Sequence, residues 1–208
     1  MKSVELRNDY LFLRSGLISD NKWGIPLIKR QGISYENFEL IAYSATKNND
    51  IKNHNKVVHF FVDDARFNVV YNNPSRSIAK LSQYRAVLSP DFSLYGEMEP
   101  WRMMESIAKN RWCGAFWQNC GMTVIPTISW STKRSYDFCF LGVEENSIVA
   151  ISTVGCQSNK KEFLDGYNEM MKRLKPSLVI CYGNPIAGMT GNVIYIKYKV
   201  EIRRNNGR

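Results

Sequence analysis

Histidine is scarce in this chain, with His54 and His59 the two among 208 residues. Both lie at or before the start of the first long apolar run, so we do not expect a Ser-His-Asp or Cys-His centre at the far ends of the strands. The five cysteines form neither a C-x-x-C pair nor a Cys/His ligand cluster. This pattern is typical of free, buried thiols in a reducing compartment rather than of disulfides or a zinc site.

Long apolar segments are also missing. No run approaches the roughly 18–20 residues that a membrane span needs, and residues 1–9 lack the apolar core of a signal peptide. Glycines match neither the P-loop nor the G-x-G-x-x-G pattern. We therefore expect a cytoplasmic protein with no membrane partner and no recognisable nucleotide-binding motif.

What the chain does have is basic charge, a net +9 that is unevenly placed. Residues 57–156 contain nine basic and nine acidic side chains, whereas residues 157–208 contain ten basic and four acidic ones. Basic surfaces attract nucleic-acid backbones without reading sequence. The candidate backbone contacts are Lys160, Lys161, Lys172, Arg173, Arg203 and Arg204. The alternative is a solvated basic face that binds an acidic protein or nothing.

Five apolar runs, each followed by a short polar segment, are the strongest structural signal. They are residues 59–62, 86–88, 124–126, 149–151 and 178–180. Continuous β-branched and aromatic runs suit strands buried on both faces of a sheet. If the strands are parallel neighbours, the five polar segments meet at one edge, where α/β proteins usually bind their ligands.

Helical patterns alternate with these runs. Helices are predicted near residues 75–84, 100–112 and 159–174. The prediction is an α/β fold with a mainly parallel sheet and flanking helices, with a partial (βα) barrel as one form of it. The predicted organisation is an N-terminal extension and polar loop (1–56), an α/β core domain (57–200) and a basic tail (201–208).

Three aspartates at the strand ends are the candidate catalytic residues: Asp63, Asp64 and Asp91. Two carboxylates brought together could share a proton or hold a divalent metal. The structural alternative is that they cap turns or pair with Arg66. No cofactor is certain from the sequence, and the identity of any metal is open.

Further polar and aromatic residues at the strand ends are candidates for ligand binding. They are Arg66, Ser93, Trp130, Ser152, Thr153, Gly155 and Tyr182. Ser152, Thr153 and Gly155 could present hydroxyls and amides to a phosphate, although one glycine in a strand–helix turn is common. Trp130 follows a strand, which makes it the best placed tryptophan to face a ligand.

The strings that follow the strands resemble those of an uncharacterised family, domain of unknown function 4417 (DUF4417). The resemblance rests on residues 59–64 (HFFVDD), 88–95 (LSPDFSLY), 111–118 (RWCGAFWQ) and 150–156 (AISTVGC), and extends over about 57–185. It implies a protein of bacteria, phages or other mobile elements and supplies no activity, cofactor or site residue.

The sequence supports one leading hypothesis and two alternatives. The leading hypothesis is a phage or mobile-element protein that binds RNA or single-stranded DNA, in one version cleaving phosphodiesters at a carboxylate/metal centre or opposing host defence. The first alternative is an enzyme or sponge that takes a nucleotide or another small molecule at the strand ends. The second is a protein-binding inhibitor without catalysis. Oligomeric state is not specified by the sequence.

Overall fold

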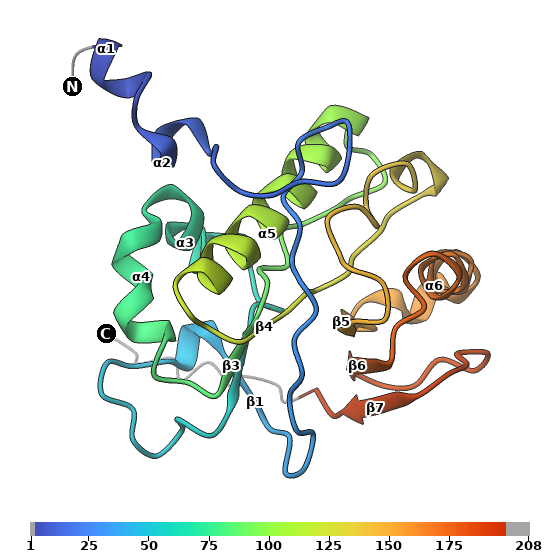
Figure 1. Ribbon diagram of the computed structural model, residues 1–208. Helices are drawn as coiled ribbons and strands as arrows, with labels where there is room; N and C mark the ends of the chain where they lie inside the picture. Colours follow the sequence, from blue (N-terminus) through green and yellow to red (C-terminus); the bar gives the residue numbers. More distant parts are fainter. Residues whose placement is uncertain (1–2, 199–208) are drawn as a thin grey trace, which may run out of the picture.

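Residues 3–198 of a computed structural model form a layer of parallel strands flanked by helices (Figure 1). Within these residues the strands are β1 (Leu40–Ala42), β2 (Val57–His59), β3 (Ala86–Leu88), β4 (Val124–Ile125), β5 (Ile148–Ser152), β6 (Leu178–Tyr182) and β7 (Val193–Ile196). The α-helices are α1 (Ser3–Leu6), α2 (Tyr10–Leu13), α3 (Val69–Asn72), α4 (Pro74–Leu81), α5 (Pro100–Asn119) and α6 (Lys160–Leu174). Single 3₁₀ turns are η1 (Tyr43–Ala45), η2 (Asp64–Arg66), η3 (Lys133–Ser135) and η4 (Cys156–Ser158).

All strand pairs are parallel, and the strands follow one another in chain order. One sheet has the order β1-β2-β3-β4 and the other β5-β6-β7. A parallel bridge between Thr127 and Ala150 connects them just beyond the end of β4. Every residue of β2, β3 and β6 is buried, as expected of strands covered on both faces. The predicted α/β fold with a mainly parallel sheet is confirmed.

The strands curve around an apolar core of their own. Val57, Leu88, Ile125, Ala150 and Ile180, from five successive strands, belong to one buried cluster. His59 of β2 also packs on Tyr182 of β6, with ring centroids 4.7 Å apart. In a flat sheet, strands four places apart would be separated by about 19 Å. The arrangement is therefore a partial barrel, open between β1 and β7.

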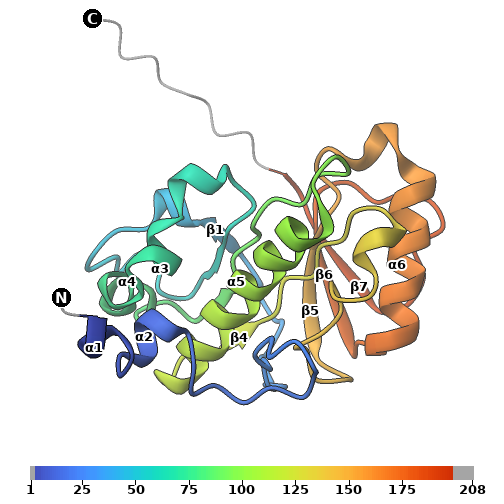
Figure 2. The same cartoon turned by 90° about the horizontal axis from the view of Figure 1, so that it is seen from above.

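Helices cover the outer face of this curved layer. Helix α5 lies across the middle of the molecule, with α3 and α4 on one side and α6 on the other (Figure 2). In α6, Phe163, Tyr167, Met170 and Leu174 are buried at helical spacing, which confirms the predicted helix. Helix α5 is longer than predicted because its second half is buried around much of its circumference and so lacks a single apolar stripe.

The first strand differs from the sequence prediction. Residues 40–42 lie in the segment assigned to an N-terminal extension, yet they pair with β2 over the full length of β1. The run is three residues long and only half-buried, so its apolar pattern is weak. The whole predicted basic tail (201–208), with Arg203 and Arg204, lies outside the described residues. Within the described part, no helix is long and apolar enough to cross a membrane.

Candidate functional site at the strand ends

A pocket of about 660 Å³ opens where the predicted polar segments meet. Segments that follow β2, β3, β4 and β5 form its walls, together with the start of α6. Among the predicted site residues it is lined by Asp63, Asp91, Ser93, Trp130, Ser152 and Gly155. We call this the strand-end pocket. Its position agrees with the usual location of ligands in parallel α/β folds.

Asp91 is the most perturbed acidic group in the pocket. Burial raises the pKa of its carboxyl from an ordinary 3.8 to about 7, and repulsion by Asp64 acts in the same direction. The Ser129 hydroxyl and the positive charge of Arg111 oppose this shift. The Oδ1 atom is shielded from solvent and has no hydrogen-bond partner among the described residues. A shielded carboxyl with a pKa near neutrality is a common feature of functional sites.

Two hydroxyls near Asp91 also have no hydrogen-bond partner among the described residues. Within the described residues, Ser129 Oγ and Thr132 Oγ1 are buried without a hydrogen bond, and both residues line the strand-end pocket. The Ser129 hydroxyl lies near enough to favour the charged form of Asp91, but its geometry falls short of a hydrogen bond. Unpaired buried polar atoms are costly and uncommon, so this group marks the strand-end pocket as a candidate functional site.

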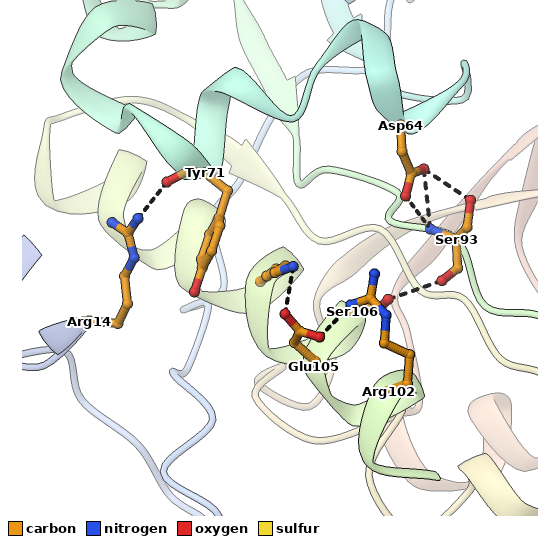
Figure 3. A network of polar contacts seen from close by, with 8 residues as sticks. Arg14, Asp64, Tyr71, Ser93, Arg102, Glu105 and Ser106 are labelled. Carbon is orange, nitrogen blue, oxygen red and sulfur yellow. Dashed lines mark hydrogen bonds and ion pairs between the residues drawn. The ribbon is translucent and has the colours of Figure 1, made fainter. Parts of the chain in front are cut away.

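The other two predicted catalytic aspartates make local hydrogen bonds. Asp64 accepts from the backbone N–H of Ser93 at 3.2 Å and from its hydroxyl at 3.0 Å, and Ser106 of α5 holds the Ser93 carbonyl (Figure 3). Asp63 accepts from the Ala65 N–H at 2.9 Å and caps the N-terminus of η2. These bonds fix the loops that carry the pocket wall.

The predicted metal centre has no support from the placement of the aspartates. Among the described residues, no three His, Cys, Asp or Glu side chains lie together in a way that could hold a metal ion. Asp63 and Asp91 line the strand-end pocket, and Asp64 supports its wall through Ser93. Asp91 is the carboxylate best placed for acid–base chemistry.

The pocket is acidic throughout. Asp63, Asp91, Glu97 and Glu162 line it, and none of the described residues that line it is Lys, Arg or His. Electrostatic repulsion therefore opposes a phosphate inside this pocket and favours a neutral or cationic group. Ser152 and Gly155 line it, as predicted for a ligand contact, but the charge around them does not suit the phosphate considered from the sequence.

Trp130 forms one wall and rests on a glycine in the middle of α6. A Cβ atom at the buried Gly166 would lie 2.1 Å from the indole Nε1. Glycine inside a helix costs roughly 1 kcal/mol relative to alanine. The close approach of the indole to the helix backbone explains why residue 166 is a glycine. Phe163 packs beside Trp130, with 5.2 Å between the ring centroids.

We expect the Gly166→Ala variant to displace Trp130 and to lower the free energy of unfolding by about 1–3 kcal/mol, because overpacking outweighs the gain in helix propensity. Urea denaturation and near-ultraviolet circular dichroism measure the two effects. Gly32→Ala is the control, since a Cβ there meets no atom within 4 Å. A Gly166→Ala variant as stable as Gly32→Ala, with an unchanged spectrum, would contradict this account of the pocket wall.

Three predicted ligand contacts lie away from the strand-end pocket. Thr153 is buried and its hydroxyl donates to the Asn184 carbonyl at 2.7 Å. Arg66 and Tyr182 line a separate cavity of about 510 Å³ between β1 and β7. The structure thus brings together the polar segments after β2 to β5, whereas the end of β6 faces the open side of the barrel.

The predicted backbone contacts on α6 are all exposed. Lys161 pairs with Asp165 at 2.9 Å and Arg173 with Glu169 at 2.7 Å. Lys160 lies at the start of the helix, near the pocket, and Lys172 lies about 18 Å further along it. The basic residues therefore run along the outer surface rather than into the pocket.

Sequence reasoning missed the polar framework beneath the pocket. Buried Arg111 of α5 donates to the carbonyls of Thr127, Cys139 and Leu141 at 2.8–2.9 Å and to Asn110. Burial lowers the pKa of this guanidinium to about 10, so it remains charged at neutral pH. The available signal was the polar pair Asn110-Arg111 inside an apolar helix.

A second set of hydrogen bonds ties the ends of β3 and β4. The Ser89 hydroxyl donates to Asn110 Oδ1 and accepts from the Thr127 N–H, both at 2.7 Å. The Thr127 hydroxyl returns a bond to the Ser89 carbonyl at 2.6 Å. Together with Arg111 these residues fix the two strand ends from which Asp91 and Ser129 enter the pocket.

The model of the family described as a domain of unknown function (DUF4417) matches residues 17–199. The chain belongs to the DUF4417 family. A Gene 1 protein of Mycobacterium phage L5 is 36% identical over 179 residues, which cover 84% of this chain and 77% of that protein. A Gene 1 protein of Mycobacterium phage D29 is 40% identical over 129 residues, 61% of this chain and 48% of the relative. DUF4417 thus includes phage proteins, as the sequence resemblance implied. No solved structure matches the chain.

Proposed function

We propose that the strand-end pocket binds a planar, nitrogen-rich ring of the nucleobase class and that Asp91 recognises its edge. The carrying observation is the shielded Oδ1 atom of Asp91, which has no partner among the described residues. With a pKa of about 7, this carboxyl is substantially protonated at neutral pH. It then places an O–H donor beside an acceptor oxygen. That pair complements a ring nitrogen next to an amino group, as in adenine and cytosine.

The walls of the pocket support the same class of ligand. Trp130 offers an aromatic surface, and base–aromatic stacking contributes about 1–3 kcal/mol per base. The volume of about 660 Å³ lies in the usual range for small-molecule sites. The acidic lining favours a base or nucleoside over a nucleotide whose phosphate enters the pocket. A carboxyl with this pKa is also suited to general acid–base catalysis on the bound ring.

Adenosine and cytidine are the probes for this proposal, titrated calorimetrically at pH 6 and pH 8. The wild-type protein is expected to bind about tenfold more tightly at pH 6, because the protonated fraction of Asp91 falls from about 0.9 to about 0.1 over this range. The Asp91→Asn variant presents the same donor and acceptor at both pH values, so its binding should not depend on pH. Equal affinity of wild type and Asp91→Ala, or no saturable binding of either nucleoside, would overturn the proposal.

Binding of single-stranded nucleic acid is a second candidate, supported by the exposed cations of α6 and the net charge of +9. A base within single-stranded nucleic acid presents the same hydrogen-bonding edge as the base of a free nucleoside. Affinity for a short oligonucleotide should then fall steeply with added salt, and salt-independent binding would argue against it. Cleavage by the three aspartates has less support, since Asp63 and Asp64 are engaged in loop hydrogen bonds.

A further inference from the structure

The opening of the partial barrel forms a second cavity with different chemistry. It lies between β1 and β7, the first and last strands of the order, and has a volume of about 510 Å³. We call it the seam cavity. Leu40 and Ile41 of β1 line one side, Ile196 of β7 lines the other, and Tyr182 at the end of β6 also lines it.

Aromatic rings line this cavity as a connected stack. The ring of Phe61 lies parallel to that of Tyr182, with centroids 5.2 Å apart, and His59 packs on Tyr182 at 4.7 Å. Tyr198 meets Tyr182 edge-on at 5.8 Å and is itself 47% exposed. The inner rings are held by one another, so Tyr198 is the ring that offers an accessible face to an incoming planar group.

The seam cavity is lined by charges of both signs with an excess of cations, whereas the described charged residues that line the strand-end pocket are all carboxylates. Lys56, Arg66 and Lys197 line it, against the carboxylates of Glu39 and Asp63. Glu39 pairs with Lys56 at 3.2 Å, and Asp63 accepts the Ala65 N–H. The cations outnumber the carboxylates, and Arg66 and Lys197 are exposed at the rim. An aromatic surface beside a guanidinium and an ammonium suits a planar ring that carries an anion.

We infer that the seam cavity is a second binding site, which takes a nucleotide with its base on Tyr198 and its phosphate near Arg66 and Lys197. The inference does not depend on the ligand of the strand-end pocket. The same chemistry is offered by a free mononucleotide and by one unit of a single strand. The two cavities are expected to differ in phosphate preference, since the strand-end pocket repels the group that the seam cavity attracts.

The probes are AMP, adenosine and a fluorescently labelled ten-residue oligothymidylate, titrated against the full chain. In the Asp91→Ala variant, which removes the proposed adenosine contact of the strand-end pocket, we expect AMP to bind at least tenfold more tightly than adenosine does, and AMP affinity to fall with added salt. If the chain binds both oligothymidylate and AMP, the ligand of the seam cavity is a unit of a single strand. If it binds AMP alone, the ligand is a free nucleotide. If neither AMP nor oligothymidylate binds, the inference is overturned.

Matched variants locate the binding. Tyr198→Ala is expected to weaken AMP or oligothymidylate binding about tenfold, and Tyr195→Ala, an exposed tyrosine of β7 outside the cavity, is its control. Lys197→Ala is compared in the same way with Lys29→Ala, a change at an exposed lysine that lines neither cavity. If the two variants of each pair lost the same binding affinity, the assignment of the nucleotide to the seam cavity would be overturned. Asp91→Ala should leave AMP binding at the seam unchanged, so failure of the nucleoside proposal and failure of this one are separable.

Discussion

Replacement of Arg111 by methionine is expected to lower the free energy of unfolding by roughly 3–5 kcal/mol, because several buried carbonyls lose their donor and each such loss costs about 1–3 kcal/mol. Methionine fills much of the volume of the arginine stem but cannot donate a hydrogen bond. The carbonyls of Thr127, Cys139 and Leu141 would then be buried without the donor that each now has in Arg111. Urea denaturation at pH 7 measures the change.

Arg102→Met is the matched control, on the same helix. Arg102 is half-exposed and pairs with Glu105 one turn along α5 (Figure 3). An exposed pair of this kind contributes at most about 1 kcal/mol. If both variants lost the same stability, Arg111 would not be the cross-link that the hydrogen bonds indicate. Arg111→Lys, which keeps the charge but has fewer donors, should fall between wild type and Arg111→Met.

The second large effect is a gain of stability in Asp91→Asn above pH 7. The folded-state pKa of Asp91 is about 7 against an ordinary 3.8. Between these values the folded chain holds a proton that the unfolded chain releases, so stability falls as pH rises. A difference of about three pH units corresponds to about 4 kcal/mol. The wild-type protein is therefore expected to lose this amount of stability between pH 4 and pH 7, and Asp91→Asn is expected to keep it.

Unfolding midpoints from pH 4 to pH 8 test this expectation. The two proteins should be similarly stable near pH 4 and should diverge steadily above it. Glu97→Gln, a change at an exposed carboxylate of the same pocket, is expected to shift stability by about 0.5 kcal/mol or less. Parallel profiles for wild type and Asp91→Asn would show that Asp91 is not buried as described. If Asp91→Asn is more stable than wild type but binds nucleosides differently, stability and function trade off at this residue, as is typical of functional groups.

Much of the fold could be predicted because its strands are short, continuous apolar runs. Residues 178–182 and α6 agree with the predicted elements almost residue for residue. Strand β1 could not be recognised, since three half-buried residues give no distinctive pattern. The curvature that closes the sheet into a partial barrel depends on how side chains of distant strands pack, which local patterns do not encode.

The candidate site was only partly predictable, for a related reason. Parallel strands bring their ends to one edge, so Asp63, Asp91 and Trp130 were expected to lie together, and they line one pocket. Tyr182 was expected there as well, but the curvature of the sheet turns the end of β6 toward the seam. The shielding of Asp91 Oδ1 and the role of Arg111 depend on loops distant in sequence, and the spacing of residues along the chain does not predict where such loops lie.

Residues 61–63 form a wall common to both cavities, since Phe61, Val62 and Asp63 line each of them. Any occupant that shifts this short segment in one cavity alters the shape of the other. The coupling free energy must then be the same in both directions: whatever factor the first ligand imposes on the second, the second imposes on the first. The three residues that follow β2 are therefore the part of the chain through which such a coupling would pass.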